Sequence, residues 1–317
     1  MFKWIVFVGF IIFGITNVDA QFHKIYKNPI QTLSGGSWQS LKTVPAINGG
    51  GFVATGTTFD TAGKQAGLLM RFDDNMEVLW EKEYYDTASG EINFYNLDLT
   101  QDRGFVITGA YSGGQTLVIK TDSLGNQEWS KKYYSYMKNL TTGIEANWVD
   151  VGFDVLQSFD GGYLITGYTN KGFGSLVDMQ AIKINNIGDT LWTKHIQITS
   201  FLNASASIIQ LKNDSSYIVS GGASGLILFR ISDKDGSIKW LKNFQLQGEM
   251  RSLKLIDEKY VIALSILKGG FSGDLMLQKV DTAGNQIWAK RYSYGNPTQI
   301  AFNSLQIAAD YDIVIGG

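Results

Sequence analysis

The chain has 317 residues, of which 44% are hydrophobic and 13% aromatic, with 36 glycines, three prolines and no cysteine. This composition can build a large core and differs from that of a disordered chain. A formal net charge of −2 excludes the strongly basic surface of a nucleic-acid-binding protein. The lack of cysteine excludes disulfides, thiol catalysis and cysteine-ligated zinc.

The N-terminal segment predicts export. Lys3 precedes an apolar run over residues 4–15, and the small residue Ala20 follows it. This order of basic, apolar and small residues is typical of a secretory signal peptide, here over residues 1–20 with cleavage after Ala20. The run is shorter than the roughly 20 apolar residues of a spanning helix, so we expect no transmembrane segment after cleavage. We therefore expect a secreted or outer-surface protein.

A tryptophan-centred repeat runs through the rest of the chain. Its five tryptophans are Trp80, Trp129, Trp192, Trp240 and Trp288. Asp or Asn lies seven residues before each of them, a basic residue nine or ten before, and Lys two after. Glycine lies four residues before each tryptophan except the first, where the residue is Met76. Repeats of about 40–50 residues indicate propellers or helical arrays.

The fourth repeat shows what each unit contains. Runs of β-branched and aromatic residues over 207–212, 217–220, 226–231 and 238–244 are separated by clusters of Gly, Asn, Asp and Ser. Such runs predict four antiparallel strands, and no window has sustained helical periodicity. Four strands per repeat of about 48 residues are typical of a propeller blade. We expect each tryptophan to wedge between neighbouring blades and the following lysine to extend over the blade edge.

The sequence thus predicts an all-β propeller of four-stranded antiparallel blades over residues 21–317. Complete repeats are expected at 33–85, 93–134, 152–196, 205–244 and 249–292, and a partial repeat at 299–317. Residues 22–27 match the outer-strand pattern without the rest of a blade, so they are expected to form an isolated outer strand. The sixth repeat has no counterpart of the third strand, which predicts a chain truncated from a longer one.

The loops on one face of the propeller vary, and variable loops on a rigid scaffold often carry function. The longest lies between Tyr134 and Val151. The candidate ligand-face residues combine aromatic rings with carboxylates: Tyr136, Glu145, Trp148, Asp150, Phe173, Asp178 and Phe271. Such a set suits stacking on a sugar or clamping a peptide. The alternative is that these loops only cover the gaps between blades.

Catalytic combinations are scarce. The two histidines, His23 and His195, both fall on expected outer strands, so neither a Ser-His-Asp relay nor a histidine-rich metal site is expected. A glycosidase needs two carboxylates, which Glu145, Asp150 and Asp178 could supply. We expect no cofactor and no metal. The leading hypothesis is a non-catalytic module that binds polysaccharide or protein at the cell surface, and the alternative is a polysaccharide-active enzyme that uses these carboxylates.

The repeat motifs resemble those of a known family. The stretches DGGYLITGYT over residues 160–169 and IKTDSLGNQEW over 119–129 are similar to the tandem units of secreted β-propeller repeat proteins common in Bacteroidetes. The resemblance covers about residues 33–317. It implies a propeller fold and a place outside the cell. Members of this family often carry a C-terminal sorting domain for type IX secretion, which this sequence lacks, and the resemblance implies no single activity.

Overall fold

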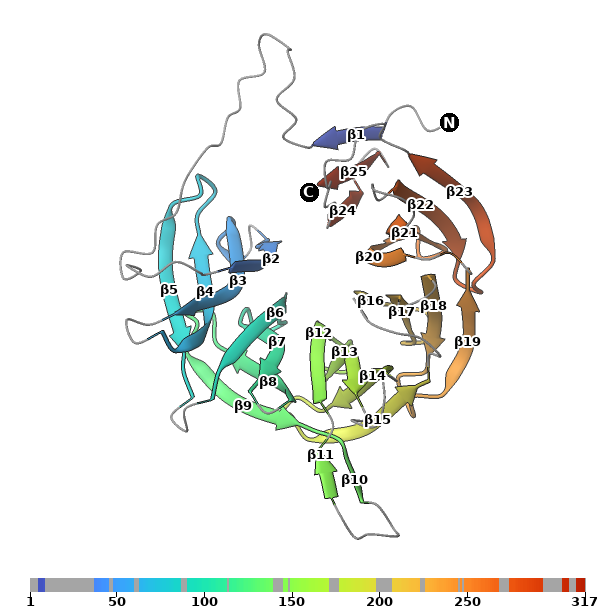
Figure 1. Ribbon diagram of the computed structural model, residues 1–317. Coiled ribbons are helices and arrows are strands. Elements are labelled where there is room, and N and C mark those ends of the chain that lie inside the picture. The colour runs from blue at the N-terminus through green and yellow to red at the C-terminus, as the bar shows by residue number, and fades with distance from the viewer. Residues whose placement is uncertain are drawn as a thin grey trace.

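The computed structural model describes most of the chain from residue 37 onward, together with a short N-terminal segment. The described residues are 5–8, 37–45, 48–59, 63–86, 90–112, 114–138, 145–147, 149–170, 177–197, 207–222, 226–244, 246, 248–267, 274–292, 304–307 and 312–316. This part of the chain contains no α-helix, and so none that could cross a bilayer. Five four-stranded antiparallel sheets and a three-stranded sheet surround a common axis (Figure 1). The predicted all-β propeller is therefore confirmed.

Each four-stranded sheet, or blade, is one continuous stretch of chain whose strands A to D run outward from the axis. Blade 1 contains β2 (Ser37–Thr43), β3 (Phe52–Phe59), β4 (Gln65–Phe72) and β5 (Val78–Tyr84). Blade 2 contains β6 (Ile92–Leu99), β7 (Phe105–Tyr111), β8 (Gln115–Thr121) and β9 (Gln127–Tyr133). Blade 3 contains β12 (Val149–Gln157), β13 (Tyr163–Asn170), β14 (Val177–Ile184) and β15 (Thr190–Ile196).

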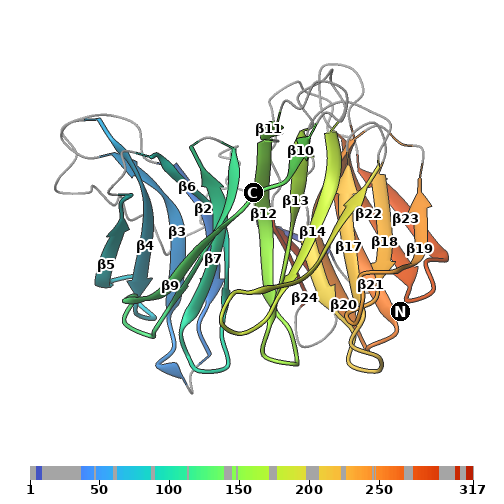
Figure 2. The ribbon, with the colours of Figure 1, turned by 90° about the horizontal axis from the view of Figure 1, so that it is seen from below.

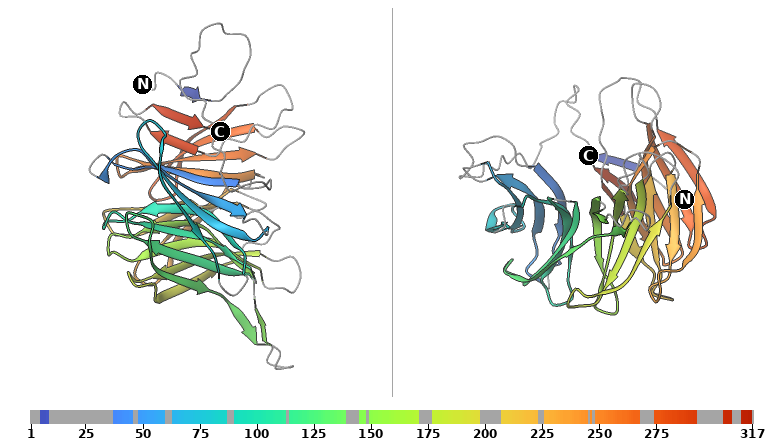
Figure 3. Two further views of the ribbon diagram at one scale, coloured as in Figure 1. Left: turned by 90° about the vertical axis from the view of Figure 1, so that its left-hand side faces the viewer. Right: turned by 60° about the horizontal axis from the view of Figure 1, so that its bottom comes forward.

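The remaining two blades follow the same order. Blade 4 contains β16 (Ser207–Gln210), β17 (Tyr217–Gly222), β18 (Leu226–Ile231) and β19 (Ile238–Asn243). Blade 5 contains β20 (Gly248–Ile256), β21 (Tyr260–Leu267), β22 (Asp274–Asp281) and β23 (Gln286–Tyr292). Between blades 2 and 3, β10 (Tyr136–Lys138) and β11 (Glu145–Asn147) form a hairpin that projects beyond the ring (Figures 1 and 3).

The sixth sheet differs from the blades in its strand direction. β24 (Ser304–Ile307) and β25 (Ile313–Gly316) pair antiparallel, like strands A and B of a blade. β1 (Ile5–Val8) then pairs with β25 in parallel, whereas every neighbouring pair within the blades is antiparallel. β1 belongs to the stretch predicted to be a signal peptide. The outer strand predicted over 22–27 lies outside the described residues.

The core lies between successive blades rather than inside any one of them. Strands B and C are buried along nearly their whole length where neighbouring blades cover both faces, as in β13 and β14 of blade 3. The outer strands β9, β15 and β19 instead alternate between exposed and partly buried residues, because only one face is covered. This alternation is the sequence pattern that period-2 side-chain geometry requires.

Four of the five tryptophans, those of blades 1 to 4, pack against the turn between strands C and D of the next blade, which confirms the predicted wedge there. A Cβ atom built on Gly125 of blade 2 would lie 2.8 Å from the ring of Trp80 in blade 1. Gly125 also has a φ of 75°, a left-handed conformation that suits glycine. The same packing joins Trp129 to the turn of blade 3, Trp192 to that of blade 4 and Trp240 to that of blade 5.

The lysine and tyrosine that follow the tryptophan complete this contact. Tyr84 and Tyr133 donate hydrogen bonds to the carbonyl oxygens of Gly125 and Gly188 in the next blade, at 2.7 and 2.6 Å. Lys131 forms an ion pair with Asp189 on the same turn, at 2.5 Å between Nζ and Oδ1. The lysine therefore does more than extend over the blade edge, because its charge meets a partner on the neighbouring blade.

The basic residue before the tryptophan is buried in blades 1 to 3, and it anchors the turn between strands A and B. Lys120 is 3% exposed and forms ion pairs with Asp102 and Glu128 at 2.7 and 2.8 Å. Lys183 is 1% exposed and pairs with Asp160 of the Asp-Gly-Gly turn at 2.9 Å. The acidic residue of the A–B turn and the basic residue of strand C, which belong to two different sequence motifs of the repeat, therefore bind each other.

A belt of hydrogen bonds near the axis joins strand A of blades 1 to 4. Ser40 of blade 1 donates to Asn96 Oδ1 of blade 2 at 2.7 Å, and Asn96 Nδ2 donates to Asp154 Oδ1 of blade 3 at 2.6 Å. The other oxygen of Asp154 accepts the backbone N–H of Ile208 in blade 4 at 2.8 Å. A β-bulge lies directly before each of the three side chains.

The two edges of the propeller are different in kind. The short A–B and C–D turns lie on one edge, and the described ends of strands B and D, where the B–C and interblade connections begin, lie on the other (Figure 2). The turn edge repeats the same contacts from blade to blade. The loop edge carries the β10–β11 hairpin, so it is where the blades differ most.

Candidate functional site

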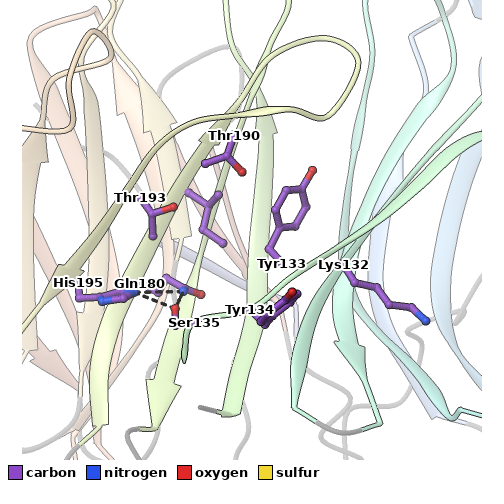
Figure 4. Close-up of a pocket in the computed structure, with 9 residues that line it drawn as sticks. Lys132, Tyr133, Tyr134, Ser135, Gln180, Thr190, Thr193 and His195 are labelled. Atoms are coloured by element: carbon purple, nitrogen blue, oxygen red, sulfur yellow. Dashed lines mark hydrogen bonds between the residues drawn. The ribbon is translucent and has the colours of Figure 1, made fainter. Parts of the chain in front are cut away.

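A pocket of about 440 Å³ lies at the outer rim between blades 2 and 3 (Figure 4). We call it the blade 2–3 pocket. Its walls come from the end of strand D in blade 2 and from strands C and D in blade 3. The lining residues are Lys132, Tyr133, Tyr134, Ser135, Gln180, Ile182, Thr190, Thr193 and His195.

Three polar side chains meet on one wall of the pocket (Figure 4). Ser135 Oγ lies 3.1 Å from His195 Nε2. Gln180 Nε2 donates to Ser135 Oγ at 3.1 Å and lies 3.3 Å from His195 Nε2. Gln180 and His195 sit opposite each other in the pairing of β14 with β15, so the blade 3 sheet itself holds them together. Ser135 approaches from blade 2.

Asp150 fixes the position of Ser135. The backbone N–H of Ser135 donates to Asp150 Oδ2, and the backbone N–H of Asp150 donates to the carbonyl oxygen of Gly114 at 2.9 Å. Asp150 is fully buried on β12, and its Oδ1 atom has no hydrogen-bond partner among the described residues. The chain leaving β9 is therefore tied to the first strand of blade 3 directly beneath the pocket.

The aromatic residues of the pocket have different roles. Tyr133 is partly buried and its hydroxyl is committed to the turn of blade 3. Burial, together with the nearby charge of Asp189, raises the pKa of Tyr133 well above its ordinary value. Tyr134, the next residue, is 56% exposed. Tyr134 therefore offers an open ring face beside the polar wall.

The one lysine in the pocket already has a partner. Lys132 Nζ lies 2.6 Å from Asp86 Oδ2 and 3.3 Å from the centre of the Tyr111 ring. Burial opposes its charge, but the hydrogen bonds to Asp86 and Tyr111 outweigh that effect and raise the pKa of Lys132. No carboxylate is among the described residues that line the pocket. The pocket is therefore close to neutral.

The predicted ligand-face residues that the structure describes lie in different places. Asp150 lies beneath the pocket, and Asp178 lies on β14 two residues before Gln180, 2% exposed. Tyr136 and Glu145 lie in the β10–β11 hairpin, where Tyr136 pairs with Asn147 and Lys138 with Glu145. The last three, Trp148, Phe173 and Phe271, lie outside the described residues. Of the predicted set, Asp150 contacts a residue that lines the pocket, namely Ser135.

Sequence reasoning missed Tyr134, Ser135 and Gln180, and it placed His195 outside any site. One signal was available. Lys183 and Trp192 are partners in the antiparallel β14–β15 pairing. The residue three before Lys183 must therefore face the residue three after Trp192, and these are Gln180 and His195. No comparable signal identified Ser135, because it belongs to a different blade.

A second group of charged residues lies on strands A around the axis. It consists of Lys42, Asp98, Asp154 and Lys254. Burial raises the pKa of Asp154 to about 6, although attraction to Lys42 opposes this. Burial, and then repulsion from Lys42, lowers the pKa of Lys254. Because both oxygens of Asp154 already accept hydrogen bonds from neighbouring strands, we assign it to holding the blades together. Among the described residues, no cluster of three or more histidines and carboxylates could hold a metal.

Comparisons with known proteins add little beyond the fold. No protein-family model and no curated protein sequence matches the chain. It is similar in structure to a protein of unknown function from Bacteroides caccae, with 11% identity and a TM-score of 0.42, over 78% of this chain and 94% of that one. It is also similar to BamB from Moraxella catarrhalis, with 12% identity and a TM-score of 0.41, over 81% of this chain and 79% of that one.

A third similar structure is the WD40 domain of Pan2 from Neurospora crassa, with 9% identity and a TM-score of 0.49, over 81% of this chain and 72% of that one. The expected relation to the secreted Bacteroidetes repeat proteins stays a prediction, because no sequence comparison tests its motifs. The propeller assignment itself follows from the sheet topology of this chain.

Proposed function

We propose that this chain is a carbohydrate-binding propeller of the cell exterior and that it seats a neutral glycan in the blade 2–3 pocket. The observation that carries the proposal is the exposed ring of Tyr134 beside a wall of uncharged hydrogen-bonding side chains. A volume of about 440 Å³ also falls within the roughly 300–1,000 Å³ typical of small-molecule sites.

The chemistry of a sugar matches both halves of the pocket. A pyranose ring has an apolar face of C–H groups, which packs well on an open aromatic ring such as Tyr134. Its edge carries hydroxyl groups that both donate and accept. Gln180 and Ser135 offer the complementary donors and acceptors, and Gln180 is 3% exposed, so it is held rigidly in the wall.

The charge of the pocket supports a neutral ligand. Lys132 is paired with Asp86, and no described lining residue is acidic. An acidic sugar would find no unpaired cation among the lining residues that the structure describes. A basic ligand would find no carboxylate there.

The glycosidase alternative requires two carboxylates that flank a bond in a cleft. Of the carboxylates predicted for that role, Asp150 and Asp178 are 0% and 2% exposed, and neither lines the pocket. Asp150 also holds the backbone of Ser135. The geometry therefore favours binding over glycoside cleavage.

The experiment measures binding of the full chain to neutral polysaccharides, such as mannan and β-glucan, and to acidic ones, such as pectate and alginate. We expect binding to at least one neutral polymer, and weaker binding by about 10-fold or more in Tyr134→Ala, equal to about 1.4 kcal/mol. Affinity electrophoresis and calorimetry give the dissociation constants.

Tyr85→Ala is the matched control, because Tyr85 holds the same place in blade 1 and is also exposed. It should leave binding unchanged. Equal loss in the two variants, or binding to acidic polymers alone, would refute the proposal.

The exterior location is supported by the N-terminal order of basic, apolar and small residues. Its test is N-terminal sequencing of the protein recovered from outside the cell. We expect the mature chain to begin at Gln21. A chain that retains residues 1–20 in the cell would contradict this part of the proposal.

A further inference from the structure

We infer that Ser135 and His195 form a nucleophile and its general base, and that they hydrolyse an ester carried by the glycan in the blade 2–3 pocket. For its substrate, this inference rests on the proposed glycan binding. The substrate class is a neutral sugar with an acyl group on one of its hydroxyls. This arrangement was not expected from the sequence, because His195 falls on an outer strand.

The distance between the two residues suits proton transfer. Ser135 Oγ lies 3.1 Å from His195 Nε2, within the range of about 2.6–3.2 Å found between a nucleophile and its base. In the tautomer with its proton on Nδ1, His195 accepts the Ser135 proton at Nε2. The pair lies in a pocket open to solvent, so substrate and water can both reach Oγ.

Both residues are held by the fold. His195 lies within the register that pairs β15 with β14, one residue from its end, and its partner there is the buried Gln180. Ser135 is fixed through its backbone N–H by the fully buried carboxylate of Asp150. A site on rigid elements keeps its geometry better than one on free loops. Asp150 is in this scheme a positioning residue, because it acts through Ser135.

Gln180 supplies the third element. Its Nε2 atom donates to Ser135 Oγ at 3.1 Å, so it is placed beside the atom that attacks. An amide N–H at this position can hydrogen-bond the carbonyl oxygen of an ester as that oxygen becomes negative. Fixed donors of this kind lower the barrier to acyl transfer.

Hydrolysis would proceed through an acyl-serine. Ser135 Oγ bonds to the acyl carbon while its proton passes to His195 Nε2. The bond from that carbon to the sugar oxygen breaks, and the proton on Nε2 moves to the sugar oxygen, which leaves as a hydroxyl. Water then attacks the acyl-serine, gives a proton to Nε2, and the serine departs with that proton. The products are a free glycan and a carboxylic acid, and no oxidant or further reactant is needed.

A neutral pocket favours an ester over other acyl or phosphoryl substrates. A phosphate ester would need an available cation, whereas Lys132 is engaged with Asp86. An acetyl or similar group is uncharged and small enough to share the pocket with the sugar. The competing explanation is that Ser135, Gln180 and His195 only hold blade 2 to blade 3.

The test uses p-nitrophenyl acetate, acetylated mannan and a fluorophosphonate probe on the full chain. We expect the probe to label Ser135, as located by mass spectrometry of peptides. Ser135→Ala and His195→Gln should each lower ester hydrolysis by about 100-fold or more, since general-base catalysis contributes about 10²–10⁴-fold. Circular dichroism and thermal melting verify that the variants are folded.

Ser123→Ala is the control, because Ser123 is an exposed serine on the C–D turn of the same blade. It should keep full activity and labelling. No label on Ser135, or hydrolysis unchanged in folded Ser135→Ala, would overturn the inference.

The two proposals fail separately. Binding of deacetylated mannan is measured on the same variants. Ser135→Ala removes one hydrogen-bonding group from the wall, so its loss of binding should be far smaller than its loss of ester hydrolysis, because Tyr134 and Gln180 remain. If mannan binds in a Tyr134-dependent way but no ester is cleaved, only the present inference is wrong. If the ester probe is cleaved but Tyr134→Ala leaves glycan binding intact, the binding proposal is wrong.

Discussion

Two neighbouring junctions of this propeller use the same places in the repeat for different chemistry. At the junction of blades 1 and 2, Asp86 at the end of blade 1 forms an ion pair with Lys132 on strand D of blade 2, at 2.6 Å. At the junction of blades 2 and 3, the equivalent positions are Ser135 and His195, whose side chains form a hydrogen bond at 3.1 Å. An ion pair closes the first rim contact, whereas the second borders a pocket.

The difference shows where the fold permits variation. Both junctions share the turn-edge contact, in which a tryptophan of one blade packs on a glycine of the next, as Trp80 does on Gly125. They differ near the loop edge, where strand D ends. The shared contact holds the blades in place, so the side chains of the other edge can change without disturbing the ring.

The largest expected effect comes from the shared contact. Gly125→Ala should lower the free energy of unfolding by about 3 kcal/mol, because its Cβ would lie 2.8 Å from the Trp80 ring at a φ of 75°. Gly161→Ala is the control, since Gly161 has a φ of 84° but no atom within 4 Å of the added Cβ. It should cost only about 1 kcal/mol. Denaturant unfolding measures both, and equal losses would refute the wedge as a stabilising contact.

The next effect is a pH dependence of the free energy of unfolding, and it comes from Asp154 at the axial end of the blade 2–3 junction. The folded pKa of Asp154 is about 6 and its ordinary value is 3.8, so folding takes up a proton between these pH values. The resulting stabilisation is complete below about pH 3.8 and is lost as the pH rises through about 6. The shift corresponds to about 3 kcal/mol.

Asp154→Asn cannot titrate and loses one acceptor of the axial belt. It should therefore be less stable than the natural protein at pH 4, and the gap should narrow by up to about 3 kcal/mol at pH 7. Urea unfolding at both pH values measures this gap. A gap that stays constant with pH would show that Asp154 does not titrate in this range.

The third test converts one junction into the other. The double substitution Ser135→Asp with His195→Lys copies the ion pair of the blade 1–2 junction into the blade 2–3 pocket. We expect glycan binding to weaken by about 100-fold, or about 2.7 kcal/mol, because two charges replace a neutral wall. The melting temperature should not fall. Retained binding would mean that the polar wall does not contact the ligand.

The smallest expected effect comes from removing the ion pair itself. Lys132→Met should lower the free energy of unfolding by about 1 kcal/mol, because the pair with Asp86 is only partly shielded from solvent. Lys212→Met is the control, since its pair with Glu258 is at 3.6 Å and Lys212 is 73% exposed. It should change stability by less than about 0.5 kcal/mol. If the two losses are equal, the rim ion pair does not stabilise the junction.

The architecture could be predicted from the sequence because its determinants are local and recur. The spacing of glycine and tryptophan around the C–D turn appears in most repeats, and the alternation of outer strands such as β15 follows from one covered face. The wedge was predictable too, since a tight turn next to a large ring leaves few other packings. What the lysine contacts was not, because Asp189 is 58 residues away from Lys131.

The pocket could be predicted only in part. Asp150, one of the predicted ligand-face residues, lies beneath the pocket. The polar wall, however, needs Ser135 of one blade to meet His195 of the next, 60 residues along the chain. Sequence patterns give the partners within a sheet, as for Gln180 and His195, but not the side chains that meet across two sheets.

The turn-edge contact also bears on how such a chain can grow. Each repeat from the second to the fifth has both a glycine that receives the preceding tryptophan and a tryptophan for the next glycine, while the first has Met76 at the receiving place. A duplicated or deleted interior repeat therefore restores a matched junction automatically. Whole repeats can therefore be gained or lost without disturbing the junctions, and each added copy would bring loop-edge residues that can change to form a different site.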